Sequence, residues 1–281
     1  MMDRRVTPVN DRVAAAHLFG SVEGRHFVAG SDARISTGLA NLLRDPDGAR
    51  DRQLLLGAPV QVYEERDGWA FVQAAQDDYC GYVRVEQVDH AAAVTHRVSA
   101  RATHVYPTPD FKQRERESLS MGALIEVTGI EGRFAETARG FIPLTHLLPV
   151  EEREVDAIEV ADRLLGTPYL WGGNSSFGID CSGLVQAGLF AVGQACPGDS
   201  DLQEAALGET LPEGTAPERG DLLFWKGHVA WVADEDTLLH ANAFHMAVAY
   251  EPLKQAIARI ADQGDGPVTR HARLPYLRRT S

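Results

Sequence analysis

The stretch from Gly166 to Gln186 constrains the fold of this 281-residue chain more than any other. Its first part contains Pro168 and the pair Gly172-Gly173, which break any regular periodicity and indicate a loop. After Cys181 the apolar residues recur at helical spacing and predict an amphipathic helix: Leu184, Val185, Leu189 and Phe190. A cysteine is therefore expected where a loop ends and a helix begins.

This position suits a nucleophile. Asp180 immediately precedes the predicted helix and is a natural N-cap. The unpaired backbone N–H groups and the dipole at a helix N-terminus favour negative charge. We therefore expect the Cys181 thiol to ionise more readily than a free cysteine, whose pKa is about 8.5.

Two histidines supply the matching base. His228 starts one predicted strand (228–232) and His240 lies in the next (237–241), with a turn between them. If the hairpin is centred on residue 234, His228 faces His240, and the Cβ atoms of such opposed residues are about 4.5–5.5 Å apart. We expect His228 to accept the proton of Cys181 and His240 to hold the tautomer of His228. The backbone N–H of Cys181 and a side chain from the preceding loop are the expected oxyanion donors.

Cys181, His228 and His240 also admit structural or zinc-binding roles. A lone cysteine or histidine is more often structural than catalytic, and His245 is given only a structural role. Cys181, His228 and His240 are also legitimate zinc ligands. The sequence has no obvious fourth ligand and no Cys-x-x-Cys spacing beside them, so zinc is the less favoured interpretation.

Upstream of the cysteine, the chain is typical of two small β-barrels. Residues 54–88 contain short strands with a turn at Asp67-Gly68, and residues 124–143 form a weaker copy of the same order. Residues 1–45 are mixed, with a short helix predicted over Leu39–Leu43. We expect an N-terminal extension and four further parts, with these bounds: extension 1–46, barrels 47–92 and 93–148, catalytic domain 152–265 and C-terminal tail 266–281.

Composition and charge exclude several classes of function. The net charge of −13 argues against a surface that mainly binds nucleic acid. No apolar core of a secretory signal follows Arg4-Arg5, and no apolar run is long enough to span a bilayer. Three cysteines do not make a disulfide framework and fit a reducing compartment. The chain is thus expected to be a cytoplasmic enzyme.

Residues 152–262 resemble the NlpC/P60 family of papain-like cysteine peptidases. The resemblance rests on these motifs: Gly-Thr-Pro-Tyr-Leu-Trp-Gly-Gly at 166–173, Asp-Cys-Ser-Gly-Leu-Val at 180–185, Gly-Asp-Leu-Leu-Phe at 220–224, Gly-His-Val at 227–229 and Leu-His-Ala at 239–241. It implies hydrolysis of the bond between γ-D-glutamate and a diamino acid in peptidoglycan. It also implies roles for four residues: Cys181 as nucleophile, His228 as base, His240 as third polar residue and Tyr169 at the oxyanion hole.

The two barrels resemble bacterial SH3 (SH3b) domains. The fold class expected is therefore α+β, with a papain-like catalytic domain preceded by two small SH3b-like barrels. This arrangement resembles the dipeptidyl-peptidase VI-like subgroup, which trims murein peptides with a free N-terminal L-alanine. In that subgroup Asp180 would bind the ammonium group and Ser182 the glutamate carboxylate. By position, Asp51 and Tyr79 of the first barrel would close the amine side of the site.

The expected function is a cysteine endopeptidase that takes part in cell-wall peptide recycling. Its expected partners are murein peptides rather than nucleic acid or membrane, and no cofactor or metal is expected. A general peptidoglycan hydrolase, or another thiol-dependent amidase or transacylase, remains the alternative. A non-catalytic peptide-binding module is disfavoured because Cys181, His228 and His240 are all present. The sequence specifies neither the diamino acid nor the oligomeric state.

Overall fold

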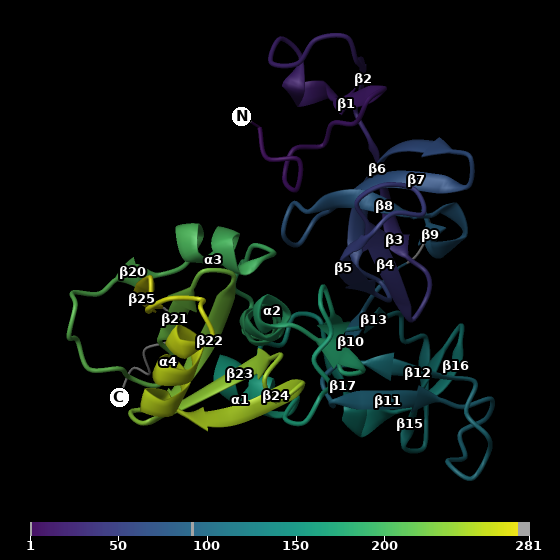
Figure 1. Cartoon of the computed structure of the whole chain (residues 1–281). Coiled ribbons are helices and arrows are strands. Elements are labelled where there is room, and N and C mark those ends of the chain that lie inside the picture. The colour runs from purple at the N-terminus through teal and green to yellow at the C-terminus, as the bar shows by residue number, and fades with distance from the viewer. Residues whose placement is uncertain (1, 91–92, 275–281) are drawn as a thin grey trace. The chain divides into compact units, whose positions relative to one another are not determined.

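The computed structural model describes residues 2–90 and 93–274, which form two compact units, one ending at Glu152 and one starting at Arg153 (Figure 1). Both helices and strands are present, as the α+β expectation requires. Within the described ranges, no helix has the length and apolar character needed to cross a membrane.

The first predicted barrel is built on a sheet of seven strands in the order β5-β4-β8-β7-β6-β3-β9. Their bounds are Ser31–Ile35 (β3), Leu39–Leu43 (β4), Arg50–Leu55 (β5), Pro59–Arg66 (β6), Trp69–Ala74 (β7), Cys80–Arg84 (β8) and Val88–Asp89 (β9). The predicted turn at Asp67-Gly68 joins β6 to β7, and both residues have positive φ (51° and 79°). A tight hairpin needs this backbone conformation, which aspartate tolerates and glycine adopts freely.

The helix predicted over Leu39–Leu43 is wrong. These residues form β4, which pairs with β5 and β8. Ala40 and Leu42 are buried while Asn41 between them is exposed, which is the two-residue period of a strand. The sheet thus takes β3 and β4 from the segment that was predicted to be an extension. Ahead of them, β1 (Val13–Ala15) and β2 (His26–Val28) pair in parallel, and a 3₁₀ turn, η1 (Ala16–Leu18), lies between them.

The second predicted barrel has shorter strands around its own apolar core. They make three small sheets, in the orders β13-β10-β17, β11-β12 and β14-β15-β16. Their bounds are His96–Val98 (β10), Ala102–Val105 (β11), Glu117–Ser120 (β12), Leu124–Ile125 (β13), Gly129–Glu131 (β14), Phe134–Thr137 (β15), Gly140–Pro143 (β16) and Leu147–Pro149 (β17). Val98, Leu119 and Ile142 are fully buried in this core. Two more 3₁₀ turns, η2 (Val85–Gln87) and η3 (Leu144–His146), precede β9 and β17.

The second unit is organised on a six-stranded antiparallel sheet in the order β20-β25-β21-β22-β23-β24. The strands are Glu209–Thr210 (β20), Leu222–Trp225 (β21), His228–Asp234 (β22), Thr237–Asn242 (β23), Ala247–Pro252 (β24) and Arg270–Arg273 (β25). A small hairpin, Asn174–Ser175 (β18) and Gly178–Ile179 (β19), lies in the loop before the cysteine. The helices are Ala157–Asp162 (α1), Cys181–Ala191 (α2), Ser200–Ala206 (α3) and Leu253–Asp262 (α4).

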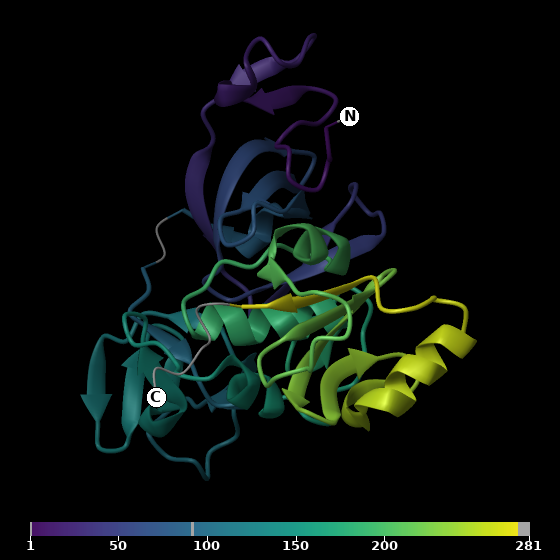
Figure 2. The same ribbon diagram turned by 90° about the vertical axis from the view of Figure 1, so that its left-hand side faces the viewer.

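Helices bury both faces of this sheet. One of them is α4, which Figures 1 and 2 both show alongside the strands. Ala256 and Ile260 of α4 pack into one core with alternate strand residues such as Ala230. The intervening residues, including Val229, are buried as well, and α2 contacts β22 and β23. The cysteine-bearing helix is thereby fixed against the strands that carry the two histidines.

The C-terminal tail predicted from residue 266 onward is only partly a tail. Residues 270–273 form β25, which is inserted between β20 and β21, and Ala272 is completely buried. Basic residues of this segment are paired inside the unit. Arg273 donates to both oxygens of Asp221, and His271 is hydrogen-bonded to the same carboxylate. Residues 275–281 of the predicted tail lie outside the described residues.

Hydrogen exchange tests the assignment of β25. Because this strand is paired on both sides, the amides of residues 270–273 that bond to its neighbours should exchange orders of magnitude more slowly than those of an unstructured peptide. Mass spectrometry of peptic fragments measures this directly, with residues 222–225 of β21 as the internal reference. Exchange as fast as in the unfolded chain would contradict the placement of β25 in the sheet.

Candidate active site

Cys181 is the first residue of α2, as expected, and Asp180 is its N-cap. One oxygen of Asp180 accepts hydrogen bonds from the backbone N–H of Gly183 (2.7 Å) and from the hydroxyl of Ser182 (2.9 Å). The other accepts from the backbone N–H of Gly172 at 2.9 Å. The cap role of Asp180 is thus confirmed, and the same carboxylate ties the preceding loop to the helix.

The expectation of an unusually acidic Cys181 is wrong. Only 7% of the residue is exposed, and burial, followed by the charge of Asp180, raises the pKa of its thiol to about 12. Hydrogen bonds from the backbone N–H groups of Val229, Ser182 and Cys181 itself act in the opposite direction but are outweighed. The reason is that desolvation penalises the thiolate more than the helix N-terminus stabilises it. The contact with Val229 places the thiol beside the residue that follows His228.

The two histidines are brought together, although not in the predicted register. His228 Nε2 lies 2.9 Å from His240 Nδ1, within hydrogen-bonding distance. Next to the turn Asp234 pairs with Thr237, and beyond a bulge the paired residue numbers add to 470, as in Trp231 with Leu239, rather than to the predicted 468. A shift of two in this sum leaves both histidines on the same face of the sheet, where diagonal neighbours remain within reach of long side chains.

Two further residues extend this pair and were missed in the sequence analysis. His240, which is completely buried, is hydrogen-bonded through Nε2 to Oε2 of Glu251 at 3.0 Å. Arg259 donates to both oxygens of that carboxylate, at 2.8 and 2.7 Å. In the register of β23 with β24, Glu251 is opposite Leu238 and so lies diagonally from His240 on one face. Two features of the sequence could have indicated these residues: the alternation of side chains along β24, and the eight-residue separation of Glu251 from Arg259.

Burial and neighbouring charges set the ionisation of this chain of groups. Burial, and then the proximity of His240, lowers the pKa of His228. Burial also lowers the pKa of His240, although the bond to Glu251 opposes it. Burial alone would raise the pKa of Glu251, but hydrogen bonds from Arg259 and His240 outweigh it and bring it to about 2. At neutral pH the site therefore contains two neutral imidazoles and an ionised carboxylate.

Tyr169 lies near the nucleophile. Burial, followed by the charges of Cys181 and Asp180, raises the pKa of its phenol, which is therefore a neutral O–H donor at neutral pH. Its backbone N–H donates to the carbonyl of Met246 at 2.9 Å. A neutral hydroxyl is a suitable oxyanion donor, and the oxyanion role that the resemblance implies for Tyr169 stays a prediction.

Asp51 and Tyr79 belong to the first unit and have local partners there. Asp51, in β5, accepts hydrogen bonds from Arg4 at 2.8 Å and from Arg44 at 3.3 Å. Tyr79 is 2% exposed, packs in the apolar core of the first barrel and lies under the guanidinium of Arg52. Both residues thus help to hold the barrel together, and their contact with a substrate stays a prediction.

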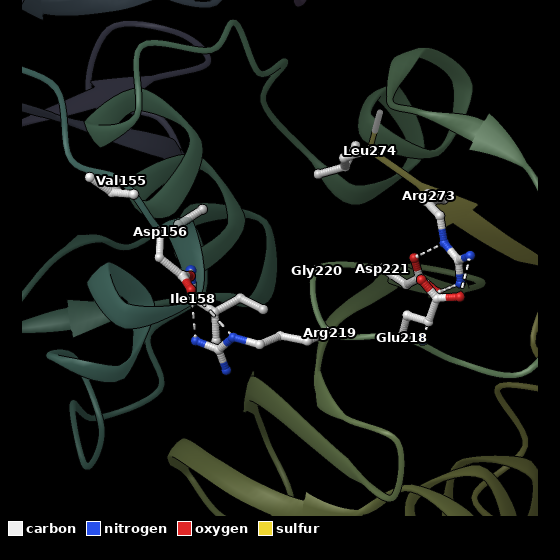
Figure 3. A pocket seen from close by; sticks show the side chains of 10 residues that line it. Val155, Asp156, Ile158, Glu218, Arg219, Gly220, Asp221, Arg273 and Leu274 are labelled. Atoms are coloured by element: carbon white, nitrogen blue, oxygen red, sulfur yellow. Dashed lines mark hydrogen bonds and ion pairs between the residues drawn. The ribbon is translucent and has the colours of Figure 1, made fainter. Parts of the chain in front are cut away.

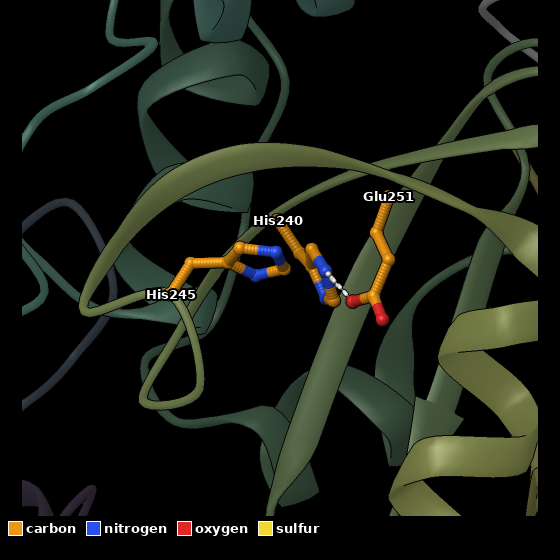
Figure 4. Close-up of side chains that lie close together, drawn as sticks. All are labelled: His240, His245 and Glu251. Carbon is orange, nitrogen blue, oxygen red and sulfur yellow. Dashed lines mark hydrogen bonds and ion pairs between the residues drawn. The ribbon is translucent and has the colours of Figure 1, made fainter.

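The zinc interpretation has a counterpart in the structure. Possible ligand atoms of His240, His245 and Glu251 lie within 4.8 Å of one another (Figure 4). However, Arg259 donates to both carboxylate oxygens, and His240 is bonded to one of them. A metal ion would have to displace these bonds beside a fixed positive charge. His240 and Glu251 therefore belong to a hydrogen-bonded chain with Arg259 rather than to a metal site, and His245 bonds Asn242 instead.

A cavity of about 610 Å³ lies elsewhere in the second unit, beside the start of α1 (Figure 3). Its charged side chains are paired with one another. Arg219 bonds Asp156 at 3.1 Å, and Arg273 bonds Asp221 and Glu218, each at 2.7 Å. None of the residues predicted to carry chemistry lines this cavity.

The ionisation of Cys181 can be measured by alkylation. Because its thiol has a raised pKa, the rate with iodoacetamide should still be rising between pH 8 and 10, and at pH 7 it should be on the order of a thousand-fold below that of free cysteine. The Cys181→Ser variant corrects for reaction at Cys80 and Cys196, which are also buried. A rate plateau below pH 7 would instead indicate a resting thiolate–imidazolium pair.

Comparisons with known proteins agree with this site. Residues 166–260 match the NlpC/P60 family, and residues 42–88 match the bacterial dipeptidyl-peptidase SH3 domain. Dipeptidyl-peptidase 6 of Lysinibacillus sphaericus is 28% identical over 234 residues, which cover 73% of this chain and 85% of the relative. The γ-D-glutamyl-L-lysine dipeptidyl-peptidase of Bacillus subtilis is 30% identical over 197 residues, 64% of this chain and 65% of the relative.

A solved structure shows the same fold. The crystal structure of an NlpC/P60 family protein from Bacillus cereus matches with a TM-score of 0.71 and 19% identity, covering 86% of this chain and 99% of that one. The two domain matches occur in the order expected from the sequence, and the second contains Cys181, His228 and His240. Residues 166–260 therefore form an NlpC/P60 cysteine peptidase domain, and residues 42–88 ahead of it form a bacterial dipeptidyl-peptidase SH3 domain.

Proposed function

We propose that this peptidase hydrolyses the bond between γ-D-glutamate and a diamino acid in peptidoglycan peptides, and that it requires a free N-terminal L-alanine. The observation that carries the chemistry is the 2.9 Å contact between His228 and His240, with the thiol of Cys181 bonded to the backbone N–H of Val229, the residue that follows His228. The names of the relatives support the substrate class. Both relatives described above are dipeptidyl-peptidases, and the name of the second includes γ-D-glutamyl-L-lysine.

The reaction proceeds in two steps. Cys181 Sγ attacks the glutamyl side-chain carbonyl carbon while His228 takes the thiol proton, and a tetrahedral oxyanion forms. The backbone N–H of Cys181 and the Tyr169 hydroxyl are the donors proposed for that oxyanion. The C–N bond then breaks, and the departing amine takes the proton from His228, leaving a thioester. Water, deprotonated by His228, hydrolyses the thioester and restores the thiol.

Because the resting thiol and imidazole are both neutral, His228 would act as a general base during the attack. The pH range in which the imidazole is neutral and the thiol is protonated is broad. It extends from above the lowered pKa of His228 to below the raised pKa of the Cys181 thiol.

Asp180 is the proposed contact for the substrate ammonium group. Its carboxylate is fixed by three hydrogen bonds from the chain and is partly exposed next to the nucleophile. A fixed anion in that position favours a cation. Ser182 is the proposed contact for the glutamate carboxylate, and its hydroxyl would donate there in place of its bond to Asp180. Asp51 and Tyr79 of the SH3 domain are proposed to close the amine side.

A requirement for a free amine points to recycling. In intact wall the L-alanine nitrogen is amide-linked to muramic acid, so such an enzyme would act on released peptides rather than on the polymer. We propose a cytoplasmic recycling role on this ground. Fractionation of cells that express the native protein tests the location.

The substrate requirement is tested by mass spectrometry of two peptides. L-Ala-γ-D-Glu-diaminopimelate should be cleaved to L-Ala-γ-D-Glu, whereas the same peptide attached to N-acetylmuramic acid should not. Cys181→Ala and His228→Ala should each lower the rate by about three orders of magnitude or more, because nucleophile and base act as one unit. Equal cleavage of both peptides would favour general wall hydrolysis, and substitution of lysine for diaminopimelate identifies the preferred diamino acid.

The role of Asp180 is tested with Asp180→Asn. Asparagine caps helices about as well as aspartate, so α2 should be retained while the charge is lost, although an amide nitrogen cannot accept the bond from the backbone N–H of Gly172. The preference for the free over the N-acetylated peptide should fall by about 10- to 100-fold, the value of a hydrogen bond to a charged group. A ratio of kcat/KM values is used because any change in the reactivity of Cys181 cancels in it. An unchanged ratio would assign Asp180 to capping alone.

A further inference from the structure

We propose that Glu251, clamped by Arg259, is a positioning residue that fixes the protons of the His228–His240 pair and thereby makes His228 Nδ1 the base that serves Cys181. The proposal deepens the proposed function and rests on it only for the turnover measurement below. The juxtaposition that carries it is the unbroken series of hydrogen bonds from His228 through His240 and Glu251 to Arg259.

The carboxylate is held more firmly than a surface group. The side chain of Glu251 is 7% exposed, and Arg259 donates to both of its oxygens. Arg259 is fixed in turn, because its Nη1 donates to Gln263 at 2.7 Å and its guanidinium lies 4.5 Å from the centroid of the Phe244 ring. A bidentate, largely buried pair of this kind keeps the carboxylate ionised and in one orientation.

An ionised carboxylate can only accept hydrogen bonds, so the atom facing it on His240, Nε2, must carry a proton. His240 is neutral, and its Nδ1 must then be the unprotonated nitrogen. The bond at 2.9 Å from that Nδ1 to His228 therefore requires a proton on Nε2 of His228. A neutral His228 with a proton on Nε2 has its lone pair on Nδ1. Each tautomer follows from the one before it, starting at Glu251.

Charge follows the same path. When His228 takes the thiol proton it becomes an imidazolium, and its Nε2–H still donates to His240. The negative charge of Glu251 then stabilises that cation through His240, while Arg259 opposes it. His245, whose ring centroid is 6.5 Å from that of His240, is a further ionisable neighbour and lowers the pKa of His240. Glu251 and Arg259 act on His240 through an unbroken series of hydrogen bonds, whereas the bond of His245 goes to Asn242.

A purely structural role is the competing explanation, because the pair also joins β24 to α4. The chain provides a matched control in Asp221, which is 1% exposed, bonded twice by Arg273 and once by His271, and outside the series. Asp221→Asn should lower stability without affecting the protons of His228. Glu251→Gln removes the same charge from the series itself.

The first measurement is NMR of the wild-type enzyme labelled with ¹⁵N in histidine rings, which needs neither substrate nor variant. We expect neutral His240 and neutral His228 both to carry the proton on Nε2. Finding either ring with its proton on Nδ1 overturns the proposal, whatever the activity proves to be. This result is also independent of the proposed substrate.

The second measurement uses the variants. In Glu251→Gln the histidine pKa values should fall further, and kcat on the tripeptide should drop by about 10- to 100-fold with little change in KM. In Arg259→Gln the histidine pKa values should move in the opposite direction, because the opposing cation is removed. If both variants lose stability but match Asp221→Asn in histidine pKa and kcat, the pair is a structural brace and the proposal fails. If no variant or wild type cleaves the tripeptide while the tautomers are as expected, the proposed substrate is wrong instead.

Discussion

The active site depends on the hydrogen bonding of polar groups that share one buried face of a sheet. His228, His240 and Glu251 come from three adjacent strands, β22, β23 and β24, and lie diagonally from one another. Buried polar groups are costly unless they are satisfied, and here each one is satisfied by the next, with Arg259 of α4 completing the series. The packing of α4 against the sheet is therefore a condition for the arrangement of the histidines.

At Cys181, two physical effects act against each other. The N-terminus of α2 and three backbone N–H groups favour a thiolate, but burial and the nearby Asp180 disfavour it and prevail. The carboxylate of Asp180 caps α2 and holds the preceding loop, so the fold needs it although its negative charge destabilises the thiolate of Cys181. A substrate ammonium group beside Asp180 would neutralise that charge. Binding and activation of the nucleophile would then be coupled through a single side chain.

Much of the chemistry was accessible from the sequence because it depends on local order. The loop before Cys181, the cap at Asp180 and the two histidine-bearing strands follow from glycines, a capping residue and alternation. Errors occurred where tertiary partners decided the outcome. Leu39–Leu43 is a strand because β5 and β8 pair with it, and residues 270–273 form a strand because β20 and β21 accept it between them. The hairpin turn lies at residues 235–236 rather than around residue 234, and this position, with a bulge after Val232, sets a register that no local pattern specified.

The sequence by itself determined the residue types of the site, their order along the chain and the fold class, since motifs and periodicity are properties of neighbouring residues. Only the tertiary structure decided the ionisation of Cys181 and the identity of the groups behind His240. Desolvation depends on what surrounds a side chain in space, and Glu251 and Arg259 reach His240 only when β24 and α4 fold against β23. Neither burial nor that contact can be read from the spacing of residues, because both arise from segments that approach one another only in the folded chain.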